Sequence, residues 1–298
     1  MYRRLQAATT LHETNVVELL KRGFAQEEIQ GRGYTTLPLA GRWKIVRQCS
    51  LGSINGLVGV PGFYFASKSG TDPHWAIAGS PGLLIPCLAP NGQIRAYRIR
   101  PDNPGEKGGK YRWLSSAGRS YGTSSGVHCH VARPLSGTAS EDEIWIVEGE
   151  LKADLSAQRL GAVVISIPGV TLWSRALADL AELLKDSGRV VVALDSDWRQ
   201  NRLVHEAVWC LAQACPALGH EVEVALWDQQ WKGLDDLLVT GQRPDLHPPN
   251  VLSEPKWPIK VSSRRLAEVS GRNPIETLRL TEMRQQIPSI LAQKDASW

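Results

Sequence analysis

The sequence has few cysteines and no long apolar run. Its five cysteines are odd in number, widely scattered and never form a CxxC pair, which argues against a disulfide framework and against a zinc ribbon. Residues 1–24 contain neither a long apolar stretch nor a small-residue cleavage site, so no secretory signal and no membrane anchor is indicated. We therefore expect a cytoplasmic protein with no membrane partner.

Charge of one sign is not in large excess either. The net charge of +4 is too small to indicate a nucleic-acid partner by itself. Positive residues nevertheless gather between Arg95 and Arg119, with only Asp102 and Glu106 among them. Such a stripe can neutralise phosphates, and a solvated hairpin is an equal alternative.

The texture of the sequence changes along the chain. With 298 residues, of which 42% are hydrophobic, the chain is long enough for about two globular domains. We expect five segments: a helical amino-terminal segment (1–50), a β-rich subdomain (51–140), an α/β domain (141–241), a proline-rich linker (242–260) and a basic helical tail (261–298). In the first segment we expect a helical stretch over 13–31, interrupted at Gly23. In the second, Pro90-Asn91-Gly92 predicts a hairpin turn.

The α/β domain alternates apolar runs with stretches of helical spacing. Strands are predicted at 144–147, 162–167, 190–194 and 220–227. Helices are predicted at 151–160, 172–185, 203–214 and 235–239. Continuous apolar strands that alternate with helices are typical of a mainly parallel sheet covered on both faces.

Acidic residues follow the predicted strands. Glu148 comes after the first, Asp195 and Asp197 after the third, and Asp235 with Asp236 after the fourth. The carboxyl ends of parallel strands share one edge of a sheet, and a D-x-D pair in extended chain points to one side. Carboxylates gathered there repel one another unless a cation lies among them, and Mg²⁺ or Mn²⁺ would suit phosphoryl or nucleotidyl transfer. Alternatively, each acid is only a helix N-cap.

Four motifs resemble the Toprim domain of bacterial-type primases, topoisomerases and some nucleases. They are VEGELKAD (147–154), PGV (168–170), ALDSDW (193–198) and KGLDDLL (232–238). The resemblance implies that Glu148 is a general acid or base and a metal ligand, and that Asp195, Asp197 and Asp235 bind metal. Two positions depart from the primase pattern, because Gly233 and Lys152 stand where primases usually carry acids.

The sequence upstream is similar to the subdomain that precedes Toprim in bacterial primases. The matching stretches are GLLIPCLAPNGQIRAYRIR (82–100) and GGKYRWLSS (108–116). The resemblance implies that Arg100 and Lys110 contact phosphates of the template or the incoming nucleotide. The full set of candidate phosphate-binding residues is Arg98, Arg100, Lys110, Arg112, Lys152 and Lys232.

These resemblances imply primer synthesis on single-stranded DNA from nucleoside triphosphates. The motifs also resemble a Toprim-bearing domain of unknown function on phage, plasmid and integrative-element proteins, which implies replication of a mobile element. Two alternatives stay open: a metal-dependent nuclease, and a non-catalytic subunit that binds DNA or recruits a helicase. A replicative helicase is therefore a candidate partner, with the basic tail as its docking segment.

Overall fold

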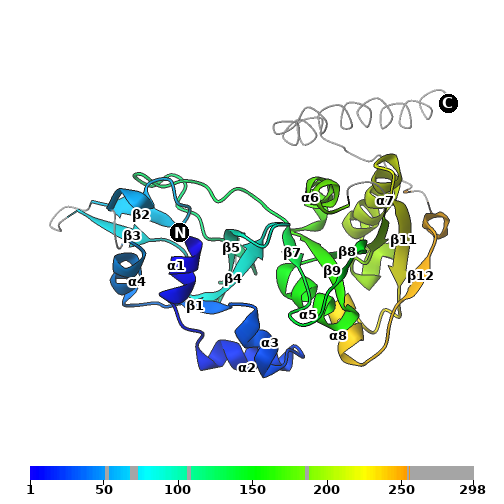
Figure 1. The fold of residues 1–298 in the computed structure, drawn as a ribbon, viewed down its shortest axis with the longest axis horizontal. Helices are drawn as coiled ribbons and strands as arrows, with labels where there is room; N and C mark the ends of the chain where they lie inside the picture. Colours follow the sequence, from blue (N-terminus) through cyan, green and yellow to red (C-terminus); the bar gives the residue numbers. More distant parts are fainter. Residues whose placement is uncertain (51–53, 68–72, 106–108, 185–187, 254, 256–298) are drawn as a thin grey trace. The chain divides into compact units, whose positions relative to one another are not determined.

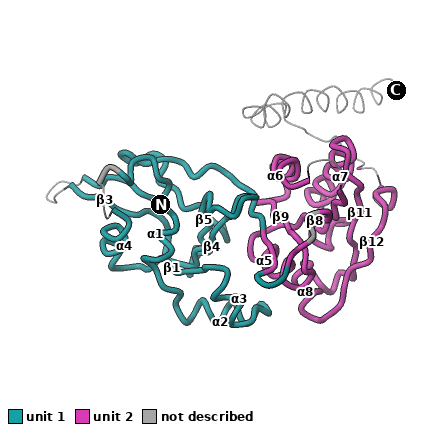
Figure 2. The backbone as a smooth tube through the Cα atoms, viewed as in Figure 1, with its two compact units in different colours: residues 1–131, 135–137 teal, residues 132–134, 138–298 magenta. Residues whose placement is uncertain are grey.

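The computed structural model describes residues 1–50, 54–67, 73–105, 109–184, 188–253 and 255. The chain forms two compact units: unit 1 is residues 1–131 with 135–137, and unit 2 is residues 132–134 with 138–298 (Figure 2). The predicted basic tail lies outside the described residues. In the part of the chain that is described, no helix has the length and apolar character needed to cross a membrane.

Unit 1 combines short helices with an antiparallel sheet. The helices are α1 (Tyr2–Ala7), α2 (Glu13–Lys21), α3 (Gln26–Gly31), α4 (Arg42–Cys49) and the 3₁₀ turn η1 (Ile54–Leu57). The strands are β1 (Thr35–Leu37), β2 (Phe63–Ala66), β3 (His74–Ile77), β4 (Gly82–Leu88), β5 (Ile94–Pro101) and β6 (Arg112–Trp113). The break expected at Gly23 lies between α2 and α3, where this glycine has a φ of 92° that favours a residue without a Cβ.

The sheet of unit 1 has the order β1-β4-β5-β6, and β2 and β3 form a separate hairpin (Figure 1). Strands β4 and β5 are antiparallel and are joined through Gly92, whose φ of 77° fits the predicted Asn-Gly turn. Tyr97 and Ile99 on β5 are fully buried in a core shared with α1 and α4. The predicted hairpin is thus confirmed.

Unit 2 is an α/β sandwich. Its strands are β8 (Ser140–Glu148), β9 (Ala162–Ile167), β10 (Arg189–Val192), β11 (Glu221–Leu226) and β12 (Asp245–His247), preceded by β7 (His130–Ala132), where the chain passes from unit 1. Its helices are α5 (Glu150–Leu160), α6 (Ala176–Leu183), α7 (Arg202–Ala217) and α8 (Leu234–Val239), with 3₁₀ turns η2 (Val170–Arg175), η3 (Ser196–Arg199) and η4 (Pro249–Val251).

The sheet of unit 2 has the order β12-β11-β10-β8-β9-β7. Its four middle strands are parallel, and every residue of β9 is buried. Helices α5 and α8 pack together on one face, while α6 and α7 lie on the other (Figure 1). The predicted mainly parallel sheet with helices on both faces is confirmed, and the structure adds an edge strand on each side of the four.

Three local predictions for unit 2 were wrong in detail. The helix expected over 172–185 begins with the 3₁₀ turn η2, because Leu172 is not helical. Asp197 does not share an extended segment with Asp195, since the chain turns into η3 directly after Asp195. The proline-rich segment is not wholly a linker, because β12 pairs with β11 at the sheet edge, where prolines are tolerated.

Gly82 is expected to be indispensable for the β4–β5 pairing. It has a φ of 151°, and a Cβ there would lie 2.2 Å from the Arg100 carbonyl oxygen. Gly82→Ala should lower the free energy of unfolding by at least about 2 kcal/mol, measured by urea denaturation. The matched control is Gly92→Ala, where no described atom lies within 4 Å of the added Cβ and only backbone strain of about 1 kcal/mol is expected. Equal losses would contradict this account.

Candidate active site

Glu148 is the last residue of β8, at the carboxyl edge of the parallel sheet. Gly149 follows with a φ of 95°, a conformation that favours glycine and lets the chain turn directly into α5. The Glu148 carboxylate accepts a hydrogen bond from the backbone N–H of Val170 in the η2 turn. Glu148 is therefore fixed by its position at the end of β8 and by a hydrogen bond from the η2 turn, which follows β9.

Asp195 and Asp197 lie in the loop that follows β10. Asp195 is the N-cap residue of η3, and Asp197 is within that turn. The backbone N–H of Ser196 donates a hydrogen bond of 3.0 Å to the carbonyl oxygen of Lys232, in the loop after β11. This bond joins the second and third acidic motifs, so their side chains lie at the same edge.

The two acids of the third motif, Asp235 and Asp236, have different contacts. Asp236 accepts a hydrogen bond of 2.9 Å from the backbone N–H of Gly233 and so caps α8, as the alternative interpretation of such acids predicts. Asp235 is buried in the first turn of the same helix and lies beside Lys152, whose pKa its charge raises. Asp235 is therefore the acid of this motif that takes part in the site.

Lys152 lies at the centre of the acidic side chains. Its Nζ donates a hydrogen bond to Asp195 Oδ1, and the two side chains are only 14% and 13% exposed. Lys232 Nζ lies 3.9 Å from the other Asp195 oxygen but is 71% exposed. Asp195 thus faces ammonium groups at both of its oxygens.

Burial and neighbouring charges have opposing effects on the pKa values of Glu148 and Lys152. Burial, with the neighbouring charge of Asp195, raises the pKa of Glu148, although Lys152 and Lys232 lower it in part. Burial would lower the pKa of Lys152, but the carboxylates of Asp195, Asp235 and Glu148 outweigh it and leave that pKa raised. Lys152 is therefore a charged ammonium, while Glu148 holds a proton more readily than an ordinary glutamate.

Asp197 has an oxygen that can bind a divalent cation. Asp197 Oδ1 is buried and has no hydrogen-bond partner among the described residues, which suits a cation ligand. Within the described ranges, no three His, Cys, Asp or Glu side chains are grouped so that they could hold a metal ion together. The predicted set of Glu148, Asp195, Asp197 and Asp235 shares one edge but does not form one cage. Mg²⁺ commonly binds through one or two carboxylates, with water and phosphate oxygens as its other ligands.

The candidate phosphate-binding residues of unit 1 have different surroundings. The Arg98 guanidinium is buried against the Trp113 ring, 4.6 Å from its centroid. Arg112 donates hydrogen bonds to Ser80 Oγ and to the carbonyl oxygen of Pro104. Arg100 lies 4.0 Å from Glu18 with a partly exposed side chain, and Lys110 is exposed. Lys110 and Arg112 are exposed and Arg100 is partly exposed, so these three members of the set lie at the surface, whereas Arg98 is buried.

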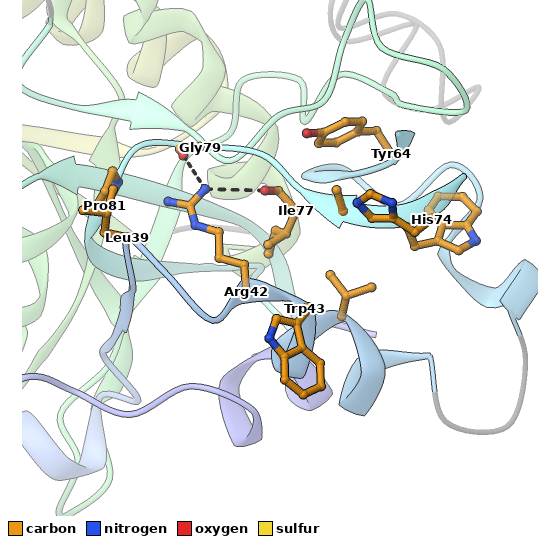
Figure 3. Close-up of a pocket in the computed structure, with 11 residues that line it drawn as sticks. Leu39, Arg42, Trp43, Tyr64, His74, Ile77, Gly79 and Pro81 are labelled. Atoms are coloured by element: carbon orange, nitrogen blue, oxygen red, sulfur yellow. Dashed lines mark hydrogen bonds between the residues drawn. The ribbon is translucent and has the colours of Figure 1, made fainter. Parts of the chain in front are cut away.

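Unit 1 also contains a cavity of about 440 Å³ that sequence reasoning did not find (Figure 3). Its wall includes the rings of Trp43, Tyr64, His74 and Trp75, and none of the described residues that line it is acidic. Arg42 braces the cavity by donating hydrogen bonds to the carbonyl oxygens of Gly79 and Pro38. Aromatic faces without acidic neighbours suit the stacking of a nucleobase.

A family model described as a domain of unknown function, DUF3854, matches residues 139–243. No curated protein matches the chain. The chain is similar to the zinc-binding and RNA polymerase domains of the Aquifex aeolicus primase, with a TM-score of 0.61 at 12% identity over 95% of this chain and 70% of that one.

Two further solved structures are similar over nearly the whole of both chains. One is a DnaG primase catalytic domain bound to ssDNA, with a TM-score of 0.56, 15% identity and coverage of 95% and 94%. The other is the RNA polymerase domain of Mycobacterium tuberculosis primase DnaG in complex with a double-stranded DNA oligomer that has a 6-nucleotide overhang. Its TM-score is 0.55 at 14% identity, over 95% of this chain and 96% of that one. The chain has the fold of a primase catalytic core. At these identities the likeness concerns the fold alone.

The sequence places the acids of this primase fold at the edge where the structure has them, but it does not indicate the bond between Lys152 and Asp195. The phosphate contact of Lys152 stays a prediction, because Asp195 uses only one of its three N–H donors. The sequence does mark Lys152 and Gly233, since they are the two departures from the primase pattern. What the sequence does not contain is the contact that relates the two.

Glu148→Gln is expected to stabilise the protein increasingly as the pH rises above about 4.5, the ordinary pKa of a glutamate. The raised pKa means that the folded protein keeps a proton that the unfolded chain has lost, so wild-type stability falls with pH across this window. Each unit of pKa shift corresponds to about 1.4 kcal/mol. Urea unfolding from pH 4.5 to 8 in EDTA measures the effect, with exposed Glu221→Gln as control. A pH-independent difference between Glu148→Gln and wild type would contradict the assignment.

Proposed function

We propose that the chain is a primase-like nucleotidyl transferase that makes primers on single-stranded DNA in the replication of a mobile element. The observation that carries the proposal is a primase-core fold over 95% of the chain, with four acidic side chains at one edge of its parallel sheet. The solved DnaG domain bound to ssDNA supports a single-stranded template. Nucleoside triphosphates are the substrates that this reaction requires.

The proposed cofactor is Mg²⁺ or Mn²⁺. Asp197 is its first ligand, because one of its oxygens is buried without a hydrogen-bond partner among the described residues. Glu148, Asp195 and Asp235 are further candidate ligands at the same edge. When bound, a divalent ion supplies positive charge to the phosphate oxygens and favours ionisation of the attacking hydroxyl.

Glu148 is proposed to accept the proton of the primer 3′-hydroxyl. That oxygen bonds to the α-phosphorus of the incoming triphosphate, and the bond to the departing pyrophosphate breaks. A carboxylate with a raised pKa is a better base near neutral pH than an ordinary glutamate. Lys232, exposed beside Asp195, is placed to contact a phosphate of the nucleotide.

Unit 1 is proposed to contact the template. Arg100 and Lys110 would bind phosphates, because Lys110 is exposed and the Arg100 side chain is partly exposed. Trp43, which is 61% exposed at the aromatic cavity, would stack on an unpaired base. Lys44 Nζ lies 5.6 Å from the centroid of the Trp43 ring and adds positive charge beside it.

A nuclease would use the same acids and remains the competing activity. A non-catalytic subunit that binds DNA or recruits a helicase is the competing role without chemistry. The segment proposed to dock a helicase, 261–298, lies outside the described residues.

Asp197→Asn should lower the rate of primer synthesis on single-stranded DNA at least about a hundredfold, because it removes the proposed ion ligand. The assay follows labelled nucleotides into short products with Mg²⁺ or Mn²⁺. Asp197 is preferred to Asp195 for this test, since Asp195 also holds Lys152.

The matched control is Asp245→Asn, the same change at an exposed position on β12, which should leave synthesis unchanged. Metal-dependent strand cleavage without synthesis would instead support the nuclease. Absence of both activities, with DNA binding intact in EDTA, would support the non-catalytic subunit.

Trp43→Ala and Arg100→Ala should weaken single-stranded DNA binding in different ways. Loss of stacking at Trp43 should weaken the binding free energy by about 1–3 kcal/mol without changing how the affinity depends on salt. Loss of a phosphate contact at Arg100 should weaken binding and also reduce the slope of log K against log salt by about 0.7. Fluorescence anisotropy at several salt concentrations separates the two. Wild-type affinity in Trp43→Ala would exclude the cavity from template binding.

A further inference from the structure

We infer that the Lys152 ammonium is a fixed cation of the carboxyl edge and fills the place where Asp195 and Asp235 would otherwise bind a divalent ion, so that the site binds a single ion, at Asp197. The inference rests on the proposed function, because it assigns the charges that meet the nucleotide phosphates. It also differs from the implication of the resemblance that Asp195, Asp197 and Asp235 all bind metal.

The position of Lys152 follows from the turn after β8. Helix α5 begins two residues beyond Glu148, so its first turn lies at the same sheet edge as that carboxylate. From there the Lys152 side chain extends to Asp195, where its ammonium is hydrogen-bonded and only 14% of the side chain is exposed. A buried ammonium is tolerated only where carboxylates compensate the loss of water, and Asp195, Asp235 and Glu148 provide that compensation.

Gly233 provides the space that the Lys152 side chain fills. A Cβ at position 233 would lie 2.8 Å from Lys152 Cε, 3.0 Å from Lys152 Nζ and 2.3 Å from Asp235 Oδ1. The backbone of Gly233 is ordinary extended chain, with a φ of −102°, so its conformation alone does not require glycine. The two departures from the primase pattern therefore lie side by side: glycine at 233 leaves room for the end of the Lys152 side chain, although both neighbouring side chains are flexible enough to move aside.

Asp197 has an oxygen available as a metal ligand. Both oxygens of Asp195 already face ammonium groups, whereas Asp197 Oδ1 has no hydrogen-bond partner among the described residues. An ammonium has three N–H donors, and Asp195 uses one of them. The other donors can bind a phosphate oxygen, which an ion coordinated by Asp195 and Asp235 would otherwise do. Unlike a bound ion, this charge is not removed by chelation.

Metal stoichiometry tests the inference directly. Wild-type protein should bind about one Mn²⁺ per chain in isothermal titration calorimetry, because one cation position is already filled. Lys152→Met keeps an unbranched side chain one atom shorter and removes the charge, which should open the position at Asp195 and Asp235 and raise the stoichiometry to about two. Lys232→Met is the matched control: it removes a neighbouring ammonium that is largely exposed, so the stoichiometry should stay at about one.

Thermal stability gives a second readout that needs no activity. In EDTA, Lys152→Met should melt below wild type, because the carboxylates of Asp195 and Asp235 lose their counter-charge. Saturating Mn²⁺ should raise its Tm by more than it raises that of wild type, since an ion that binds only the folded state stabilises it. This comparison keeps the test decisive if Lys152→Met folds only when metal is present.

Two results would overturn the inference. One is two ions bound to wild-type protein, and the other is an unchanged stoichiometry in Lys152→Met together with the same Tm gain from Mn²⁺ as wild type. Neither depends on primer synthesis. If the wild-type chain binds one ion, Lys152→Met binds two and no synthesis is found under any condition, the proposed function fails while the role of Lys152 stands.

Discussion

A buried ammonium among carboxylates holds the functional edge of this molecule together. The Lys152 bond to Asp195 joins the start of α5 to the loop after β10, and the Ser196 bond to Lys232 extends the connection to the loop before α8. Without a positive charge there, Glu148, Asp195 and Asp235 would be pushed apart by like-charge repulsion in a poorly hydrated place. The parallel sheet brings the three acidic motifs, far apart in the chain, to one edge, and this charge lowers the repulsion between their carboxylates.

The parallel sheet and its acidic edge were predictable because both depend on local pattern. Four continuous apolar runs with helical stretches between them suffice for a parallel sheet covered on both faces, and acids directly after such strands must share an edge. Glu148, Asp195 and Asp235 are found there. Asp236, which follows the same pattern, only caps its helix. Spacing alone does not separate those two uses of an aspartate.

The rest depends on contacts between residues distant in sequence. Nothing along the chain indicates that Lys152 bonds to Asp195, 43 positions away, or that Gly233 lies beside the end of that lysine. The aromatic cavity of unit 1 has the same origin, since α4 and the β2–β3 hairpin supply its wall from separate stretches of chain. Short turns such as η3 were missed because tertiary packing, not periodicity, decides where an extended chain bends.

The edge strand β12 bears on whether two copies of this chain can pair through their sheets. It pairs antiparallel with β11 and so occupies the backbone N–H and C=O groups that the last parallel strand would otherwise present to solvent. Leu252, just beyond it, is buried and anchors the segment. A chain ending at Gly241, the boundary that composition suggests, would leave β11 as an open template for strand addition. Strand β12, in the proline-rich stretch, therefore covers the edge of β11 and keeps that edge from pairing with a strand of another copy.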